Sequence, residues 1–197
     1  MMNLSATLNI FRLLTNPSLC LPQATIPTFD QLPHPLAKAF IPSSPNPDPT
    51  RQEKPSLNLP DIRAVILDKD NCFAVPKTNT IHPPYLPRFA LLRAEFPSAR
   101  LLIVSNSAGT ASDDPGGREA ALLERETGVR VLRHATKKPG CGAEILRVLR
   151  EEAGVRCPSQ VVVVGDRLLT DVMMGNLMGA RGVWVRDGVV VDRGLVC

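Results

Sequence analysis

Residues 62–70 read Ile-Arg-Ala-Val-Ile-Leu-Asp-Lys-Asp, an apolar run that ends at the carboxylates Asp68 and Asp70. A mostly apolar run of this length is typical of a strand that is buried on both faces of a parallel sheet. Further apolar runs that we interpret in the same way follow along the chain, at residues 100–104, 129–132, 161–164 and 182–186. The sequence therefore predicts a parallel sheet in which the first strand ends at a pair of acids.

Helical patterns lie between these runs, at residues 84–96, 117–127, 141–153 and 168–178. Strands and helices that alternate along a chain predict a doubly wound α/β domain. In such domains ligands bind beyond the carboxyl ends of the strands. Polar residues occupy that place after three of the predicted strands, namely Asp68, Ser105 and Asp166.

The composition of the chain is uneven along its length. The 197 residues are 44% hydrophobic and 21% charged, which excludes a wholly disordered chain. The chain contains no run of about 18 apolar residues, so we expect no transmembrane helix. Residues 1–60 contain 11 of the 19 prolines and none of the 13 glycines. We therefore divide the chain into a proline-rich arm over residues 1–60 and an α/β domain over residues 61–197.

An amphipathic helix is predicted at the start of the arm, over residues 4–16. Its apolar stripe holds Leu4, Leu8 and Phe11, polar residues line the opposite stripe, and Pro17 ends it. Three interpretations remain open from the pattern: the helix packs on the domain, lies in a membrane interface, or belongs to an organelle presequence. Packing has the most weight on the pattern alone, because most amphipathic helices face a protein core.

Charge and cysteine content narrow the functional classes. The net charge of +4 suits an anionic partner. However, no basic run with interleaved aromatic residues occurs, so we expect no nucleic-acid binding. The five cysteines are an odd number without Cys-x-x-Cys spacing, which predicts neither a disulfide framework nor a structural zinc site. We expect a reducing compartment.

Two pairs of acids are suited to phosphoryl chemistry. Asp68, at the end of a buried strand, can be a phosphoryl-accepting nucleophile, and Asp70 can act as general acid and base. The segment Gly-Asp-Arg-Leu-Leu-Thr-Asp places Asp166 and Asp171 where a strand passes into a helix. These two carboxylates can hold a hard cation through oxygen ligands. The alternative is an ordinary helix N-terminus, where aspartate is also favoured.

A serine and a lysine pair complete the set. Ser105 can hydrogen-bond a phosphate oxygen, or it can cap the turn that follows its strand. Lys137 and Lys138 precede a predicted helix. A lysine there can neutralise charge on a phosphoryl group, although a pair of surface lysines is the plainer alternative. Each motif is weak alone, but the four together in this order are far more specific.

The four motifs in this order resemble those of the haloacid dehalogenase-like phosphatase superfamily. The match covers about residues 61–187. Longer stretches are similar to the fungal mitochondrial phosphatidylglycerophosphate phosphatases: Leu-Asp-Lys-Asp-Asn-Cys at 67–72, Ser-Asn-Ser-Ala-Gly at 105–109, Leu-Arg-His-Ala-Thr-Lys-Lys-Pro-Gly-Cys at 132–141, Gly-Asp-Arg-Leu-Leu-Thr-Asp at 165–171 and Leu-Asn-Ile-Phe-Arg-Leu-Leu-Thr-Asn-Pro-Ser-Leu-Cys at 8–20. The resemblance implies a Rossmann-like α/β sheet with a minimal cap.

The resemblance also implies roles for the four acids. Asp68 attacks the phosphorus atom and forms an aspartyl-phosphate. Asp70 protonates the leaving glycerol oxygen and then activates water. Mg²⁺ is the implied cofactor, held by carboxylate oxygens of Asp68 and Asp166 and by the backbone carbonyl of Asp70, with Asp171 in support.

Five further residues receive roles in the same way. Ser105 is implied to bind a phosphoryl oxygen, and Lys138 to neutralise its charge. Lys137 is the alternative for that lysine, and otherwise meets the second phosphate of the substrate. Asn106 and Arg167, which stand inside the matching motifs, are assigned to substrate binding together with Lys137.

The lengths of the loops bear on the substrate. The stretches 71–99 and 108–130 each hold one helix, which leaves no room for a separate cap domain. An open site suits a phosphate at a membrane surface, so with the resemblance included we favour membrane docking by residues 4–16 over core packing. The resemblance implies that an anionic phospholipid, phosphatidylglycerophosphate, is hydrolysed to phosphatidylglycerol for cardiolipin biosynthesis, by a peripheral protein on the matrix side of the mitochondrial inner membrane. The oligomeric state stays open.

Other functions remain as alternatives. Cys141 and Arg147 have the Cys-x5-Arg spacing of cysteine-dependent phosphatases, although Glu144 and an apolar helix face argue against a phosphate loop there. A phosphatase of a soluble sugar or nucleotide monophosphate is the runner-up, because only the resemblance identifies the lipid. A receiver-like signalling domain and a non-catalytic lipid-binding scaffold are the remaining classes, and the full set of acids argues against both.

Overall fold

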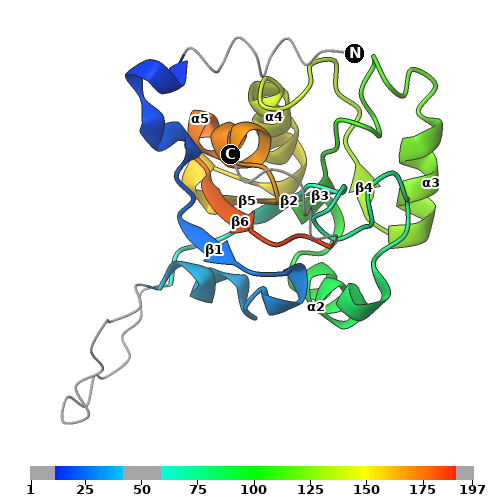
Figure 1. The fold of residues 1–197 in the computed structure, drawn as a ribbon, viewed down its shortest axis with the longest axis horizontal. Coiled ribbons are helices and arrows are strands. Elements are labelled where there is room, and N and C mark those ends of the chain that lie inside the picture. The colour runs from blue at the N-terminus through cyan, green and yellow to red at the C-terminus, as the bar shows by residue number, and fades with distance from the viewer. Residues whose placement is uncertain (1–11, 42–58, 190–197) are drawn as a thin grey trace.

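The computed structural model describes residues 12–41 and 59–189, which form a six-stranded parallel sheet with helices on both sides. The strand order is β1-β6-β5-β2-β3-β4 (Figure 1). The strands are β1 (Ala24–Ile26), β2 (Ala64–Leu67), β3 (Leu101–Ile103), β4 (Arg130–Val131), β5 (Val161–Gly165) and β6 (Arg181–Val185). The predicted parallel α/β sheet is confirmed, with β1 as a strand that the sequence analysis did not predict.

Helices cover both faces of the sheet. α4 (Gly142–Ala153) and α5 (Met173–Met178) pack on one face, while α2 (Leu86–Glu95) and α3 (Arg118–Thr127) join the core on the other (Figure 1). A π-helix, Leu168–Val172, leads into α5. Short 3-10 helices lie at Pro17–Cys20, Phe29–Gln31, Leu36–Phe40, Pro83–Tyr85, Ser98–Arg100 and Pro158–Gln160. All four predicted helical segments are present, the last as a π-helix followed by an α-helix.

Side chains alternate between the two faces along the central strand β2. Val65 and Leu67 join the core cluster that includes side chains of α2 and α3. Ala64 and Ile66 join a second cluster with side chains of α4 and α5. Because both faces of this strand are buried, every position from 64 to 67 is apolar. The uninterrupted apolar run in the sequence is thereby explained.

The predicted proline-rich arm is wrong for residues 17–41, which belong to the α/β domain. β1 pairs in parallel with β6, with Ala24 opposite Val183 and Ile26 opposite Val185. The predicted division near residue 60 therefore cuts one folded unit in two. Within the described residues, the domain consists of this segment together with residues 59–189.

Aromatic packing explains why this segment folds onto the domain. The Phe29 side chain is fully buried, and its ring centroid lies 6.0 Å from that of Phe73 and 5.8 Å from that of Tyr85. β1 is three residues long and lies at the edge of the sheet. Pro22 and Pro27, which flank it, are tolerated there because proline is compatible with edge strands. The prolines thus mark a short edge strand and its turns rather than an extended linker.

Part of the prediction for the N-terminal segment lies outside the described residues. Residues 12–15 are helical and Asn16 is not, whereas residues 4–11 of the predicted helix and residues 42–58 lie outside the described ranges. Within the described ranges, no helix combines the length and the apolar character that crossing a bilayer requires. The loops after β2 and β3 contain no inserted domain within residues 59–189, so the site has a minimal cap.

Candidate active site

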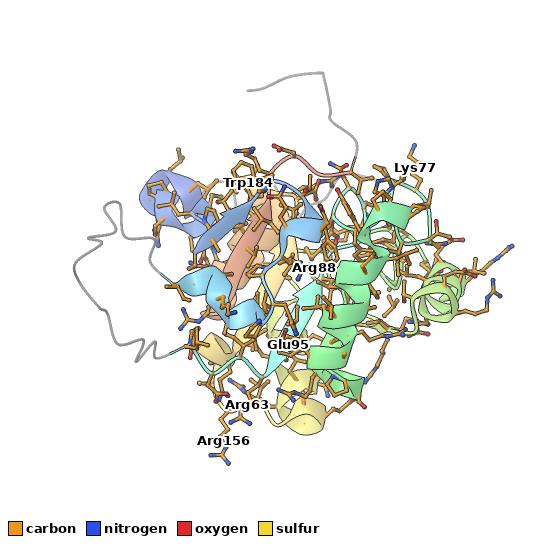
Figure 2. The ribbon with its side chains drawn as sticks, turned by 90° about the horizontal axis from the view of Figure 1, so that it is seen from below. Arg63, Lys77, Arg88, Glu95, Arg156 and Trp184 are labelled. Carbon is orange, nitrogen blue, oxygen red and sulfur yellow. The ribbon has the colours of Figure 1, made fainter. Side chains whose placement is uncertain are left out.

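The predicted acids meet because β2 and β5 are neighbours at the centre of the sheet. Leu67 pairs with Val164, and the Asp68 backbone N–H donates to the Val164 carbonyl oxygen at 2.9 Å. The chain continues from β2 to β3 on one side of this pair and later to β6 on the other. Ligand crevices open at such points, beyond the carboxyl ends of the strands. Figure 2 shows Trp184 and Lys77 at this end of the sheet.

Lys138 lies between two of the acids. Its Nζ is 2.5 Å from Asp68 Oδ1 and 2.6 Å from Asp171 Oδ1, and all three side chains are buried. Burial raises the pKa of Asp68 to about 7 against the opposing charge of Lys138, and the charges of Asp171 and Asp166 add to the rise. Burial would lower the pKa of Lys138, but Asp171 and Asp68 raise it above its usual value, so the ammonium group keeps its charge.

The tight turn after β5 places Asp171 beside the end of the strand. A Cβ atom on Gly165 would lie 2.4 Å from Asp171 Cγ, so this close approach requires glycine. Asp171 Oδ2 accepts a hydrogen bond from the Arg167 backbone N–H at 3.1 Å. Asp171 itself stands in the π-helix that begins at Leu168. The spacing Gly-Asp-x-x-x-x-Asp thus returns the second acid to the site.

Three carboxylates could hold a divalent cation. Oxygen atoms of Asp68, Asp166 and Asp171 lie within 4.8 Å of one another. Asp166 Oδ2 accepts a hydrogen bond from Asn71 Nδ2 at 3.3 Å, whereas Oδ1 is buried and has no hydrogen-bond partner in the described part of the chain. Burial raises the pKa of Asp166, and the charge of Asp171 adds to the rise. A buried carboxylate oxygen without a donor, beside two further acids, fits a hard, oxygen-preferring cation such as Mg²⁺.

Asp70 is held at both of its carboxylate oxygens. Oδ1 accepts hydrogen bonds from Lys69 Nζ at 2.6 Å and from the Lys77 backbone N–H at 2.8 Å, and Oδ2 accepts one from the Ser107 hydroxyl. Burial would raise the pKa of Asp70, but the hydrogen bonds from Lys69 and Ser107 bring it below its ordinary value. The sequence analysis missed Lys69 and Ser107, although both stand inside motifs that it singled out.

The segment after β3 connects to the segment that carries Lys138. Ser105 is 1% exposed, and its carbonyl oxygen lies 3.1 Å from His134 Nε2. Asn106 Oδ1 accepts a hydrogen bond from the Lys138 backbone N–H at 2.8 Å. Asn106 and His134 therefore help to fix Lys138 relative to Ser105. No pattern in the sequence pointed to His134.

A small cleft unites most of the predicted site residues. It has a volume of about 20 Å³, which is enough for about one water molecule or ion, and is lined by Asp68, Asp70, Asn106, Lys138, Arg167 and Thr170. Lys137 is absent from this lining, and its Nζ forms an ion pair with Asp113 Oδ2 at 2.6 Å. The lining also lacks Ser105, Asp166 and Asp171. The substrate-binding roles of Asn106, Lys137 and Arg167 stay predictions.

The surroundings of Cys141 argue against the cysteine-dependent alternative. Cys141 directly precedes α4, so Glu144 and Arg147 stand in a regular helix rather than in a phosphate-binding loop. Its Sγ lies 3.6 Å from Met174 Sδ in the core. Burial raises the pKa of the Cys141 thiol to about 12, so that the nucleophilic thiolate is scarce at neutral pH.

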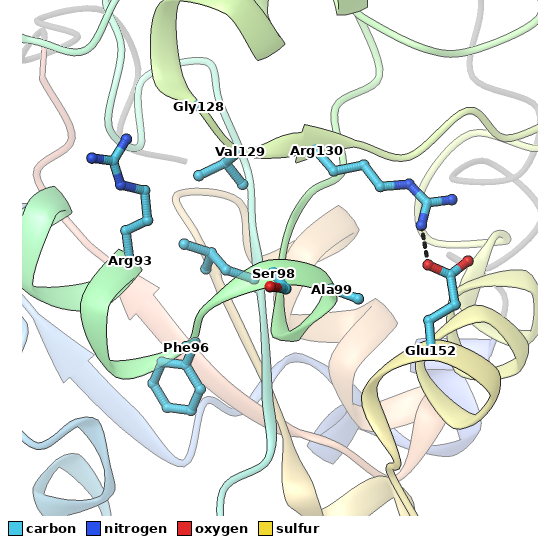
Figure 3. A pocket seen from close by; sticks show the side chains of 9 residues that line it. Arg93, Phe96, Ser98, Ala99, Gly128, Val129, Arg130 and Glu152 are labelled. Atoms are coloured by element: carbon cyan, nitrogen blue, oxygen red, sulfur yellow. Dashed lines mark hydrogen bonds and ion pairs between the residues drawn. The ribbon is translucent and has the colours of Figure 1, made fainter.

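A second hollow lies at the opposite edge of the sheet, where β3 and β4 begin (Figure 3). Its volume is about 310 Å³, and it is lined by Arg93, Phe96, Ser98, Ala99, Leu101, Gly128, Val129, Arg130 and Glu152. Arg130 forms an ion pair with Glu152, and Arg93 donates to the Thr127 carbonyl oxygen at 3.1 Å. None of the motif acids lies here, so we assign the chemistry to the carboxyl end of the sheet.

The resemblance to the haloacid dehalogenase-like phosphatases implied a Rossmann-like α/β sheet in which the motif acids act together. The structure brings the matching acids, Asp68, Asp166 and Asp171, together around Lys138. Fold and site therefore define the class of the protein as an α/β protein with an acidic site at the carboxyl end of a parallel sheet, as that resemblance led us to expect.

Comparison with known proteins leads from the class to a family. The family described as mitochondrial PGP phosphatase matches residues 4–190. The mitochondrial phosphatidylglycerophosphatase of Saccharomyces cerevisiae is 47% identical over 97% of this chain and 91% of its own length. A probable mitochondrial phosphatidylglycerophosphatase of Schizosaccharomyces pombe is 36% identical over 88% of this chain and 78% of its own. The chain belongs to the mitochondrial phosphatidylglycerophosphate phosphatase family and is a phosphatase.

Proposed function

We propose that this enzyme hydrolyses phosphatidylglycerophosphate to phosphatidylglycerol and inorganic phosphate, as a step of cardiolipin biosynthesis in mitochondria. The names of the fungal relatives support the substrate. The observation that carries the chemistry is the place of Asp68, at the end of the central strand with Lys138 Nζ 2.5 Å away. An ammonium group at that distance can offset the charge of an anionic phosphate that approaches a carboxylate.

In the proposed first step, a carboxylate oxygen of Asp68 attacks the phosphorus atom. A bond forms between that oxygen and phosphorus, while the bond from phosphorus to the glycerol oxygen breaks, which leaves an aspartyl-phosphate. Asp70 gives a proton to the departing glycerol oxygen, and it has to gain that proton when the anionic substrate binds, because in the free protein its hydrogen bonds hold its pKa below the ordinary value. Lys138 offsets the charge on the phosphoryl group, and the Ser105 hydroxyl donates a hydrogen bond to one of its oxygens.

In the second step, water attacks the phosphorus atom of the aspartyl-phosphate. Asp70, now a carboxylate, takes a proton from that water. The bond between phosphorus and the Asp68 oxygen breaks, and inorganic phosphate leaves. The two steps consume water and return Asp68 and Asp70 to their starting protonation states.

Mg²⁺ is the proposed cofactor. Asp68, Asp166 and Asp171 would hold it with the backbone carbonyl of Asp70, and the buried Oδ1 of Asp166, which has no donor in the described chain, supports the proposal. When bound, the ion supplies positive charge that orients the phosphate and offsets its negative charge.

A phosphate-release assay tests substrate and cofactor together. The full chain is compared on phosphatidylglycerophosphate, phosphatidic acid and soluble sugar and nucleotide monophosphates, with Mg²⁺ and after chelation. We expect the fastest release from phosphatidylglycerophosphate and none after chelation. Faster release from a soluble monophosphate would instead support the alternative function, and no release from any substrate would support the non-catalytic scaffold.

Two substitutions identify the nucleophile. Asp68→Asn should abolish phosphate release, because the amide cannot attack phosphorus. Cys141→Ser should keep most of the activity, because the Cys141 thiol is buried in the core. The assignment of Asp68 would be overturned by the reverse pattern of activities.

We also propose that the enzyme acts as a peripheral protein on the matrix side of the mitochondrial inner membrane, docked through residues 4–16. The apolar stripe of that segment supports this, and burial at about 25 cal/mol per Å² makes one short helix a modest, reversible anchor. Replacement of Leu8 and Phe11 by Asp should release the protein from anionic liposomes in a flotation assay. Replacement of Asn9 and Asn16 by Asp adds the same charge on the polar stripe and should keep most of the binding. Unchanged binding of the first variant would contradict the docking proposal.

A further inference from the structure

A buried lysine that the proposed mechanism does not use lies between Asp68 and Asp70 in the sequence. Lys69 is 2% exposed, and its Nζ donates hydrogen bonds to Asp70 Oδ1 at 2.6 Å and to the Thr78 carbonyl oxygen at 2.8 Å. Burying an ammonium group is costly unless it is paired and hydrogen-bonded. The ion pair with Asp70 and the hydrogen bond to the Thr78 carbonyl oxygen offset that cost. The charged partner of Lys69 is therefore the proposed acid and base itself.

Donors from both sides of the site converge on the Asp70 carboxylate. Lys69 Nζ and the Lys77 backbone N–H both reach Oδ1, and the Ser107 hydroxyl, from the loop after β3, reaches Oδ2. The Ser107 Oγ also lies 3.0 Å from the Oγ of Ser105. Rotation of the Asp70 carboxylate would break hydrogen bonds at both oxygens, so its direction in the site is fixed.

We propose that Lys69 and Ser107 are positioning residues that hold Asp70 for proton transfer to the leaving group. The inference rests on the proposed function, because it takes Asp70 as the acid and base. Lys69 acts twice: it orients Oδ1 directly and, through the Thr78 carbonyl, fixes the turn whose Lys77 N–H also reaches Oδ1. Ser107 fixes the other oxygen from the neighbouring loop. A displacement of about 1 Å at a reacting group can reduce the rate about 100-fold.

A purely structural role for Lys69, in which it only stabilises the turn at 75–78, predicts a different dependence on the substrate. The glycerol oxygen is a poor leaving group unless it receives a proton, whereas a nitrophenolate leaves readily without one. Loss of a residue that positions the acid therefore affects an alkyl phosphate much more than an aryl phosphate. Loss of a residue that only stabilises the turn affects both substrates alike.

The test compares kcat/KM of the full chain on phosphatidylglycerophosphate and on p-nitrophenyl phosphate, both with Mg²⁺. Lys69→Met keeps most of the length of the side chain without its charge. We expect its kcat/KM to fall by a factor at least about tenfold larger on the lipid than on the aryl phosphate. Lys38→Met, in the exposed part of the 3-10 helix Leu36–Phe40, is the matched control and should change neither value. In an Asp70→Asn background Lys69→Met should add little, because it acts through Asp70.

The proposal would be overturned if Lys69→Met lowered kcat/KM by the same factor on both substrates. It would also be overturned if the substitution lowered kcat/KM as much in the Asp70→Asn background as in the unsubstituted enzyme. If Lys69→Met does not fold, Ser107→Ala decides by the same ratio, because Ser107 is exposed and the substitution removes the donor to Oδ2. It also removes the contact with Ser105 Oγ, but a disturbed Ser105 would lower kcat/KM on both substrates alike and leave their ratio unchanged. Failure of the proposed function is seen separately, as an unsubstituted enzyme that releases no phosphate from the lipid. In that event an alkyl monophosphate that the enzyme does hydrolyse takes the place of the lipid in the comparison.

Discussion

The ammonium group of Lys138 bridges Asp68 and Asp171, with Nζ 2.5 Å from the first carboxylate and 2.6 Å from the second. The bridge joins the end of β2 to the π-helix that follows β5, so it connects the proposed nucleophile to the cation site. Both acids and the lysine are buried. Because the three charges share one small space, a change to any of them should alter both activity and stability.

Replacement of Lys138 by Met should remove most activity and destabilise the protein. Removing one partner of a buried ion pair costs about 3–5 kcal/mol, because the remaining charge stays buried. Loss of an electrostatic contact to the reacting group lowers kcat by roughly 100-fold or more. Urea unfolding and phosphate release measure the two effects.

Lys137→Met is the matched control for that substitution. Lys137 pairs with Asp113 in a more exposed position, so its removal should cost at most about 1 kcal/mol. A role of Lys137 in substrate binding would raise KM and leave kcat largely unchanged. An equal loss of kcat in both variants would show that Lys138 has been wrongly assigned.

The stability of the metal-free protein should fall as the pH rises toward 8. Asp68 has a pKa of about 7 in the folded protein, against about 3.9 in an unfolded chain. Between these values the folded state holds a proton that the unfolded state has released, so the stabilisation present at low pH is lost as the pH rises through about 7. Unfolding by urea in the presence of a chelator, at about pH 5.5 and about pH 8, measures the difference.

Two further conditions check the origin of this pH dependence. Asp68→Asn should weaken it, because the titrating group is gone. Mg²⁺ should raise the Tm more at about pH 8 than at about pH 5.5, since the cation binds ionised carboxylates and stabilises the state that binds it. A pH dependence that is equally steep with and without Asp68 would assign it to other groups.

Gly165→Ala should disturb the cation site through Asp171. The added Cβ would lie 2.4 Å from Asp171 Cγ, which forces the carboxylate or the strand end to move. Overpacking of this kind costs about 1–3 kcal/mol, and the displaced acid should also weaken Mg²⁺ activation. Gly116→Ala, where a Cβ would meet no atom within 4 Å, is the control and should leave both properties close to those of the unsubstituted protein.

The sequence predicted the central sheet and the four acids because burial and strand ends leave local patterns. Val161–Val164 and the run before Asp68 are apolar since both faces of their strands are covered. The place of each acid relative to a strand end then follows from the parallel topology. The resemblance already favoured Lys138 over Lys137, and the contacts of Lys138 Nζ with Asp68 and Asp171, which join segments far apart in the sequence, support that prediction.

The contacts around Asp70 could not be predicted, because they depend on loop conformation. Asn71 and Lys77 adopt positive φ values of 59° and 66°, and these turns direct the loop so that the Lys77 N–H reaches Asp70. Positive φ is uncommon for residues other than glycine and has no clear signal at a lysine. The lysine between the two acids was visible in the sequence, but the direction of its side chain was not.

The strand β1 in the N-terminal segment was missed for a different reason, because three residues are too few to show a hydrophobic period. The burial of this segment in the structure leads to a prediction about stability. Phe29→Ala should destabilise the protein by about 3–5 kcal/mol, because the ring is fully buried against Phe73, Tyr85 and Phe89. Leu21→Ala, in the same segment but with 63% of the residue exposed, should change stability by no more than about 0.5 kcal/mol. Urea unfolding measures both variants. If residues 17–41 were an arm independent of the domain, the two substitutions would be equally harmless, so a large difference between them establishes that this segment is part of the folded phosphatase.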